Sequence, residues 1–294
     1  MSGRFAPTPS ADLHLGNLRT ALVAWLAARA SARGFIVRVE DLDWPRLPDA
    51  DAIVRRQLAD LTRLGLTWDG EVVRQRDRTD LYEAALARLA PLVYECFCSR
   101  KEVATATRAP HGTTPRYPGT CRNLTAAARD RLRRVRPPAL RVDAGAAELM
   151  VHDELWGRYA GLVDDFVVRR ADGVFAYNFA VVVDDGLQGI DQVVRGDDLL
   201  ESAPRQAWLA TQLGFPVPSY LHIPLVLAAD GTRLAKRDRA QSLTGLLDAG
   251  LTLPGLLSRL AHSLGLAAAD EPVDLMTLVR RFNPARLPRE PWLV

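Results

Sequence analysis

The sequence predicts an α/β protein built around a parallel sheet, and two observations indicate this class. The run "FIVRVEDLD" (Phe35 to Asp43) is β-branched and ends in acidic residues, which is typical of a buried strand with a polar carboxyl end. On both sides of this run, apolar residues recur at helical spacing. Alternating strands and helices are typical of parallel sheets, in which ligands gather at the carboxyl ends of the strands.

The elements follow in a simple order. The first helix is expected over Leu15–Arg33, where apolar residues recur with a helical period until Gly34 ends the run. After Tyr94 the chain is rich in Cys, Pro, Gly and Thr without clear periodicity, so we expect an insertion that something other than a core holds together. Further helices are expected at 49–66 and 79–92, strands at 139–142 and 164–170, a helix–strand–helix pattern over 173–213, and a helical tail from 251 onward.

Composition excludes several classes of protein. With 48% hydrophobic and 25% charged residues among 294, the chain resembles an ordinary soluble protein with enough apolar side chains for a core. A net charge of +3 permits an RNA or phosphate partner without requiring one. We see no secretory leader and no apolar stretch near the N-terminus of the ~20 residues that span a membrane, so we expect a cytoplasmic protein without a membrane partner. Three cysteines, an odd number, argue against a disulfide framework.

The stretch "RFAPTPSADLHLGN" (4–17) places a histidine, a glycine and an asparagine where the first helix begins. A helix N-terminus presents unpaired N–H groups and the positive end of its dipole, so His14, Gly16 and Asn17 suit an anion such as phosphate. A merely capped helix explains the same residues equally well. The glycine-rich patterns of P-loops and dinucleotide sites are absent from the sequence, which excludes those two ways of binding nucleotides.

A second motif, "DGTRLAKRDRA" (230–240), is a glycine turn followed by clustered cations. Most such loops are solvated charged turns. However, Lys101 and Lys236 are the only lysines among 38 basic residues, and a mobile ammonium suits a phosphate whose geometry changes during reaction.

Together the two motifs resemble the signatures of class I aminoacyl-tRNA synthetases. "HLGN" resembles the HIGH signature and "RLAKR" resembles the KMSKS loop, while "RFAPTPSADLHLGNLRTAL" resembles the amino-terminal region of glutamyl-tRNA synthetases. "RVEDLD", "FAYNFAVVVDD" and "VVRGDDLL" match between them, so the resemblance covers residues 4–240. It implies two halves of a Rossmann-like catalytic domain (1–94 and 151–222), an insertion between them (95–150), and a region with the KMSKS-like loop and stem-contact-like helices (223–294).

The resemblance also implies roles for individual residues. His14 and Asn17 would orient ATP and stabilise the pentavalent α-phosphate, and Lys236 would hold the β- and γ-phosphates, with magnesium accompanying ATP. Glu40 would bind the substrate ammonium. A dicarboxylate with one ammonium requires two separate cations and one anion, which fits this set. The implied ATP site comprises His14, Gly16, Asn17, Arg233, Leu234, Ala235, Lys236 and Arg237, and the implied glutamate site comprises Arg4, Phe5, Ala6, Pro7, Thr8, Glu40, Tyr177 and Arg195.

The late loop departs from its family pattern at two positions. Ala235 stands where the middle serine is usual, and Arg233 replaces the first lysine. Neither change removes Lys236, but the missing hydroxyl puts the ordering of the loop in question.

The cysteines predict one structural zinc ion. Cys96 and Cys98 lie two residues apart and Cys121 follows a Pro/Gly-rich loop, which suits a tetrahedral site that needs a fourth ligand. Spacing alone leaves His111 and Tyr117 open, as well as three free thiols without metal. The pattern Cys-x-Cys followed by Tyr-x-x-x-Cys resembles the zinc module of short glutamyl-tRNA-synthetase-like enzymes, which implies Tyr117 as the fourth ligand.

Length narrows the choice within the family. Residues 241–294 are too few for an anticodon-binding domain, so the chain most resembles the glutamyl-queuosine tRNA(Asp) synthetases, a family of truncated paralogues. That resemblance implies activation of glutamate by ATP without tRNA and transfer to the queuosine in the anticodon stem-loop of tRNA(Asp), by a monomer. The arginines of "RDRLRRVR" (129–136) suit phosphate contacts or a solvated helix face. A minimal glutamyl-tRNA synthetase that charges a tRNA 3′ end and a catalytically silent binding paralogue are the alternatives.

Overall fold

The computed structural model describes residues 1–47, 49–107, 116–234 and 239–294, and its centre is a seven-stranded sheet. All neighbouring strands pair in parallel except the last two, so the predicted α/β class is confirmed. In spatial order the strands are β3 (Val73–Arg74), β2 (Gly34–Val39), β1 (Ser2–Phe5), β9 (Ile190–Gly196), β10 (Ser219–Ile223), β6 (Glu148–Asp153) and β7 (Gly157–Leu162).

The strand order creates a crevice between β1 and β9. After β1 the chain passes through α1 (Leu15–Ala30) to β2 on one side, whereas after β9 it passes through α7 (Ala203–Gln212) to β10 on the other. The two connections therefore diverge at the carboxyl ends of neighbouring parallel strands, and this is the place where open α/β sheets bind their ligands.

Helices cover the sheet and supply two large apolar clusters. The first cluster joins α1 to the C-terminal helices, and the second surrounds α6 (Tyr177–Leu187). The helix α1 ends three residues earlier than predicted because Ala32 adopts a left-handed φ of 55° and turns the chain toward β2. The strand β2 ends at Val39, four residues before the predicted end, so Glu40 lies in the turn that follows. The remaining helices of this part are α2 (Ala50–Arg63) and α3 (Thr79–Arg88).

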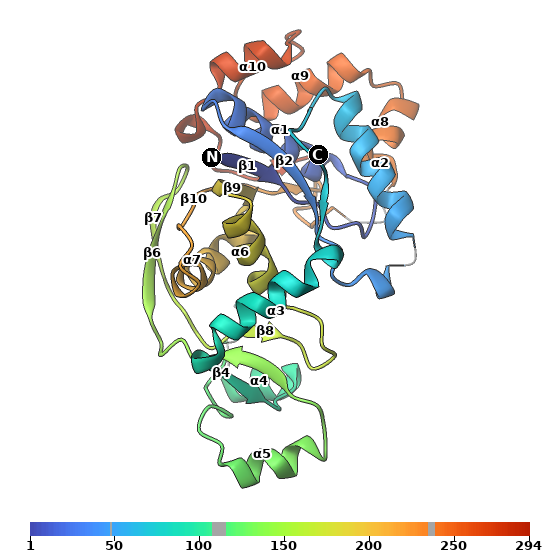
Figure 1. Ribbon diagram of the computed structural model, residues 1–294. Coiled ribbons are helices and arrows are strands. Elements are labelled where there is room, and N and C mark those ends of the chain that lie inside the picture. The colour runs from blue at the N-terminus through green and yellow to red at the C-terminus, as the bar shows by residue number, and fades with distance from the viewer. Residues whose placement is uncertain (48, 108–115, 235–238) are drawn as a thin grey trace.

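Two smaller units flank the sheet at opposite ends of the molecule (Figure 1). One is an antiparallel sheet of β4 (Val93–Cys96), β5 (Ala139–Val142) and β8 (Val167–Arg169), with α4 (Arg100–Thr107) and α5 (Ala126–Arg133) beside it. The other comprises α8 (Leu243–Asp248), α9 (Leu253–Ser263), α10 (Leu275–Arg281), and β11 (Val226–Leu227) paired with β12 (Trp292–Leu293). No helix in the described ranges has the length and apolar character needed to cross a membrane.

Candidate active site

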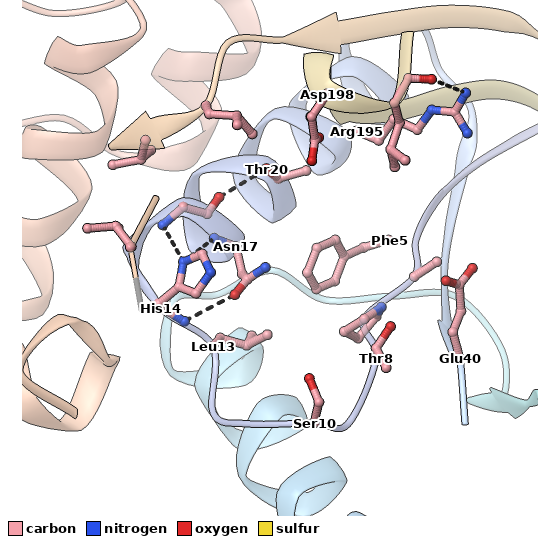
Figure 2. A pocket seen from close by; sticks show the side chains of 18 of the residues that line it. Phe5, Thr8, Ser10, Leu13, His14, Asn17, Thr20, Glu40, Arg195 and Asp198 are labelled. Atoms are coloured by element: carbon pink, nitrogen blue, oxygen red, sulfur yellow. Dashed lines mark hydrogen bonds between the residues drawn. The ribbon is translucent and has the colours of Figure 1, made fainter. Parts of the chain in front are cut away.

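A cavity of about 530 Å³ lies at the carboxyl ends of β1 and β9, in the crevice that the strand order creates. Figure 2 shows His14 and Asn17 at one end of this cavity and Arg195 and Glu40 at the other, with Phe5 between them. The structure thus brings together the two residue sets that the sequence suggested for ATP and for glutamate. The predicted residues that line it are Arg4, Phe5, Ala6, Pro7, Thr8, His14, Gly16, Asn17, Glu40, Tyr177, Arg195, Arg233 and Leu234.

His14 caps helix α1 with its own ring. Its Nδ1 accepts hydrogen bonds from the backbone N–H groups of Gly16 (3.1 Å) and Asn17 (3.3 Å), while Asn17 Oδ1 accepts from the His14 N–H (3.2 Å). Nδ1 therefore carries no proton, and in the neutral ring the proton sits on Nε2. The capped-helix reading is thus correct, and it fixes donor groups, His14 Nε2–H and the Asn17 amide, at the cavity wall.

Gly16 makes this cap possible. A Cβ at this position would lie 2.9 Å from His14 Cε1 and 3.1 Å from Nδ1, closer than ordinary contacts allow. A side chain at residue 16 would therefore push the His14 ring out of its capping position.

The late loop begins at the same cavity. Arg233 lines it and pairs with Asp198 across a distance of 3.2 Å, and Leu234 lies beside it. The loop therefore starts at the wall of the cavity. Ala235, Lys236 and Arg237 lie outside the described residues.

The opposite end of the cavity is built from buried charges. Arg4 is 3% exposed, and its guanidinium donates to Asp185 Oδ1 (3.3 Å) and to the Val194 carbonyl (3.2 Å). Asp185 also accepts from Arg38 (2.7 Å), which is fully buried and reaches Glu40 Oε1 at 3.5 Å. Burial opposes the charge of Arg38, but the carboxylates of Asp185, Asp184 and Glu40 outweigh it and raise the pKa of Arg38.

Glu40 presents a carboxylate that suits an ammonium ligand. Its Oε1 is buried and makes no hydrogen bond with any described residue, and its side chain is 10% exposed. Burial raises the pKa of Glu40, whereas the charges of Arg38 and Arg4 oppose this rise. A cation bound beside Glu40 would favour the charged form of this carboxylate.

Tyr177 and Arg195 complete the end of the cavity for which the sequence predicted glutamate binding. Arg195 is 5% exposed and its three nitrogens donate to His222 Nε2 (2.9 Å), to Gln206 Oε1 (2.6 Å) and to the Leu199 carbonyl (3.2 Å). Confinement of the Tyr177 phenol raises its pKa, and the charges of Arg195 and Arg4 act against this rise. Two guanidinium groups and two carboxylates, Glu40 and Asp185, thus act on a single tyrosine at this end.

The residues that hold these charges in place were missed by the sequence analysis. Arg38 and Asp185 lie within segments predicted as strand or helix, where they look like ordinary buried positions, and His222 lies in a segment for which no element was predicted. One signal was available for Arg38: it lies two residues before Glu40, and strand periodicity places such residues on the same face.

A second cavity of about 990 Å³ adjoins the first and shares Thr8, Glu40 and Tyr177 with it. It extends toward the small antiparallel sheet and is lined there by Cys98 and Arg141. The amino-acid end of the first cavity is therefore accessible from two directions.

The three cysteines converge at the base of the small sheet. The Sγ atoms of Cys96, Cys98 and Cys121 lie within 4.8 Å of one another, and those of Cys98 and Cys121 are 3.6 Å apart. Sulfur ligands at about 2.3 Å from a tetrahedral zinc ion are about 3.8 Å from each other, so the cluster fits this metal.

Tyr117 lies in the same cluster. Its Oη is 3.3 Å from Cys96 Sγ and 3.7 Å from Cys98 Sγ, and it accepts from the Cys121 N–H (2.9 Å). Burial raises the pKa of the Tyr117 phenol, so a phenolate here requires the charge of a bound cation. The Arg141 guanidinium lies 3.9 Å above the ring centroid and adds positive charge on that face. His111 lies outside the described residues.

The fold and the cavity define a class I tRNA synthetase catalytic domain. The family model described as "tRNA synthetases class I (E and Q), catalytic domain" matches residues 1–288. A solved glutamate tRNA ligase from Elizabethkingia meningosepticum, in complex with its amino acid, superposes with a TM-score of 0.81 at 23% identity. The match covers 100% of this chain and 66% of that chain, so this chain spans about two thirds of the ligase. A glutamate-tRNA synthetase from Elizabethkingia anophelis gives a TM-score of 0.82 at 24% identity, covering 100% of this chain and 68% of that one.

Curated relatives specify the family further. The chain is 57% identical to the glutamyl-Q tRNA(Asp) synthetase of Nocardia farcinica over 296 residues, which covers 100% of this chain and 93% of that protein. It is 50% identical to the protein of the same name from Cutibacterium acnes, across 96% of this chain and 81% of that protein. The chain therefore belongs to the family of the glutamyl-Q tRNA(Asp) synthetases.

Proposed function

We propose that this protein activates L-glutamate with ATP, without requiring tRNA, and transfers the glutamyl group to the queuosine of tRNA(Asp). One observation carries the proposal. A single cavity joins a capped helix N-terminus at one end to a buried set of two guanidinium groups and one carboxylate at the other. ATP needs the first of these environments and glutamate needs the second. The names of the close relatives support the same reaction and acceptor.

In the activation step, an oxygen of the glutamate α-carboxylate attacks the α-phosphorus of ATP. Pyrophosphate leaves, and glutamyl-adenylate forms. In this proposal His14 Nε2–H and the Asn17 amide, which lie at the cavity wall, donate to the α-phosphate, where negative charge gathers in the pentavalent transition state. Lys236 receives the β- and γ-phosphates together with magnesium. Arg233, held beside the cavity by Asp198, adds a second cation at the same end.

Arg4, Glu40, Tyr177 and Arg195 hold the amino acid. Glu40 binds the ammonium group, and the two buried guanidinium groups receive carboxylate oxygens. Because these charges are already fixed by buried partners, they need little reorganisation when glutamate binds. If glutamine bound instead of glutamate, a buried guanidinium would face a neutral amide and lose its ion pair with the side-chain carboxylate. This loss accounts for the selectivity for glutamate over glutamine.

In the transfer step, a hydroxyl oxygen of the queuosine cyclopentenediol attacks the glutamyl carbonyl carbon. An ester forms, the hydroxyl proton is lost to solvent or phosphate, and AMP leaves. The second cavity supports this step because it meets the amino-acid end at Glu40 and Tyr177, away from the nucleotide end. The acceptor can therefore approach glutamyl-adenylate without displacing AMP.

One structural zinc ion, held by Cys96, Cys98, Tyr117 and Cys121, supports the insertion. The apolar cluster around these residues is small, so the metal would supply stability that the core does not. Elemental analysis of freshly purified protein should find about one zinc per chain. Tyr117→Phe should weaken zinc retention against a chelator, and equal retention by wild type and this variant would remove Tyr117 from the ligand set.

The reaction is tested with labelled glutamate, ATP and two tRNA pools, one containing queuosine and one lacking it. Pyrophosphate exchange should proceed without tRNA, and label should enter tRNA(Asp) only in the queuosine-containing pool. Label in both pools would indicate a minimal glutamyl-tRNA synthetase, and an absence of exchange would indicate a silent binding paralogue.

The remaining partners are proposals as well. We propose a monomer that acts in the cytoplasm on the anticodon stem-loop. On the insertion, Arg133 pairs with Glu95 and Arg136 pairs with Glu102, so these two arginines already have exposed protein partners. Phosphate contacts from α5 would therefore involve its other arginines first.

A further inference from the structure

We propose that Asp153 and His222 act as positioning residues for Arg195, so that its guanidinium presents only its terminal nitrogens to the substrate carboxylate. The three side chains form a buried chain of hydrogen bonds, which we call the Asp153–His222–Arg195 relay. This inference rests on the proposed function in that Arg195 is taken to bind glutamate.

The register of the central sheet builds the relay. Arg195 on β9 lies directly opposite His222 on β10, so their side chains share one face of the sheet. Asp153 ends β6, the next strand beyond β10. Asp153 and His222 are fully buried and Arg195 is 5% exposed at the cavity wall. Three neighbouring strands therefore carry one polar path from the far side of β10 to the candidate active site.

The donor and acceptor roles in the relay are fixed by chemistry. A guanidinium has no acceptor, so Arg195 Nε–H donates to His222 Nε2 at 2.9 Å, and Nε2 carries no proton. The ring proton of the neutral imidazole must then be on Nδ1, which donates to Asp153 Oδ2 at 2.7 Å. Burial, assisted by the Arg195 charge, lowers the pKa of His222 and so favours this neutral ring.

Asp153 is held as firmly as the histidine that it orients. Its Oδ1 accepts from the backbone N–H groups of Leu155 (2.9 Å) and Trp156 (2.8 Å), and its Oδ2 also accepts from the His222 N–H (3.0 Å). Burial alone would raise the pKa of Asp153, but these hydrogen bonds outweigh it and hold the pKa below its ordinary value. The carboxylate therefore stays charged and selects one histidine tautomer.

The hydrogen bonds of Arg195 determine which of its N–H groups remain available to the substrate. Arg195 has five N–H groups, and three have described partners: Nε with His222, one terminal nitrogen with Gln206 (2.6 Å) and the other with the Leu199 carbonyl (3.2 Å). One N–H remains on each terminal nitrogen. A carboxylate is therefore bound through the terminal nitrogens, whereas the side-on mode through Nε is blocked.

Two substitutions of His222 separate the two halves of the relay. His222→Asn keeps a donor near the Nδ1 position for Asp153 but has no acceptor that reaches Arg195. His222→Gln keeps an acceptor near the Nε2 position for Arg195. Calorimetry should show that His222→Asn weakens glutamate binding about tenfold to hundredfold, since a hydrogen bond to a charged group is lost. His222→Gln should stay within about threefold of wild type, and neither substitution should change ATP affinity.

A double-mutant cycle distinguishes positioning from a general structural role. In an Arg195→Ala background, His222→Asn should cause no further loss of glutamate affinity, because its effect passes through Arg195. An additive loss, or equal affinities of His222→Asn and wild type, would overturn the proposal. Circular dichroism confirms that each variant is folded.

A measurement without substrate tests the relay by itself. Nitrogen-15 NMR of the wild-type histidines should show His222 with a protonated Nδ1 and an unprotonated Nε2, and the opposite tautomer would overturn the relay. If wild type bound no glutamate while His222 showed the expected tautomer, the proposed function would fail and the relay would stand.

Discussion

The two ends of the cavity are built on different physical principles. At the amino-acid end, Arg4 and Arg195 are 3% and 5% exposed, and each is fixed by other buried polar groups. At the nucleotide end, the charges belong to the N-terminus of α1 and to a loop whose first cation, Arg233, has a side chain 71% exposed. One end is preformed by buried charged and polar groups, whereas the other combines a fixed backbone with the exposed side chain of Arg233.

The difference follows from the two ligands. Glutamate is small, and its ammonium and side-chain carboxylate keep their charges while the α-carboxylate reacts, so fixed partners suit these two groups. The phosphates of ATP rearrange as pyrophosphate leaves, and a long side chain on a loop can follow them. The comparison predicts that damage to the amino-acid end appears mainly in folding and glutamate affinity. Damage to the nucleotide end should appear mainly in ATP affinity and reaction rate.

The largest expected effect is that of Arg38→Met. This substitution leaves the buried carboxylates of Asp184 and Asp185 without a central cation, so the free energy of unfolding should fall by about 3–5 kcal/mol in denaturant titrations. The control is Arg33→Met, which breaks a partly exposed pair with Asp191 at 2.9 Å and should cost less than about 1 kcal/mol. Equal losses in the two variants would show that the buried ion network does not organise this end.

Lys236→Ala should have the next largest effect, confined to the nucleotide end. Removing a cation that faces the developing phosphate charge should reduce the rate of pyrophosphate exchange by about 10²–10³-fold, while calorimetric glutamate affinity stays unchanged. The chain offers a matched control in Lys101→Ala, the other lysine, which lies on α4 far from both motifs in sequence. An exchange rate that survives Lys236→Ala would remove this residue from the proposed mechanism.

Gly16→Ala should disturb the same end more mildly. The added methyl group would lie 2.9 Å from His14 Cε1, so the ring must leave its capping position. Loss of a cap typically costs about 1 kcal/mol, so the KM for ATP should rise roughly fivefold to tenfold. The KM for glutamate measured in the same assays serves as the internal control, and a similar rise in both constants would contradict a division between the two ends.

The two ends of the cavity were not equally predictable from the sequence, because one depends on local contacts and the other on contacts between distant residues. The first helix and its capped N-terminus depend on residues close together in the chain, and local spacing predicts them. The cysteine cluster was predictable for another reason, since cysteine is rare in this chain and its metal chemistry is distinctive. The ion pair of Arg38 with Asp185 and the hydrogen bond of Arg195 with His222 join residues 147 and 27 positions apart. Such contacts depend on strand order and register, which local patterns do not contain. Arg4, Glu40 and Arg195 were therefore predicted only through family resemblance.

Acidification should produce the smallest effect, and it acts on Glu40. Burial raises the pKa of Glu40 above its ordinary 4.5, so this carboxylate takes up a proton at a higher pH than an exposed one. The protonated group cannot pair with an ammonium. Glutamate affinity measured by calorimetry should therefore fall as the pH is lowered through the raised pKa of Glu40, at a higher pH than an exposed glutamate would cause.

Protonation of Glu40 alone should increase the stability of the folded chain as the pH falls, whereas it decreases glutamate affinity. Since its pKa is higher in the folded than in the unfolded chain, folding is favoured as pH falls from the raised value toward 4.5. His222, Asp153 and Asp185 have lowered pKa values, so their contributions to stability decrease as the pH falls. The difference in stability between wild type and Glu40→Gln therefore isolates the contribution of Glu40. Relative to this variant, wild type should gain stability and lose glutamate affinity in the same pH window. If both quantities fell together, Glu40 would be an ordinary structural carboxylate and the amino-acid end would lack its anion.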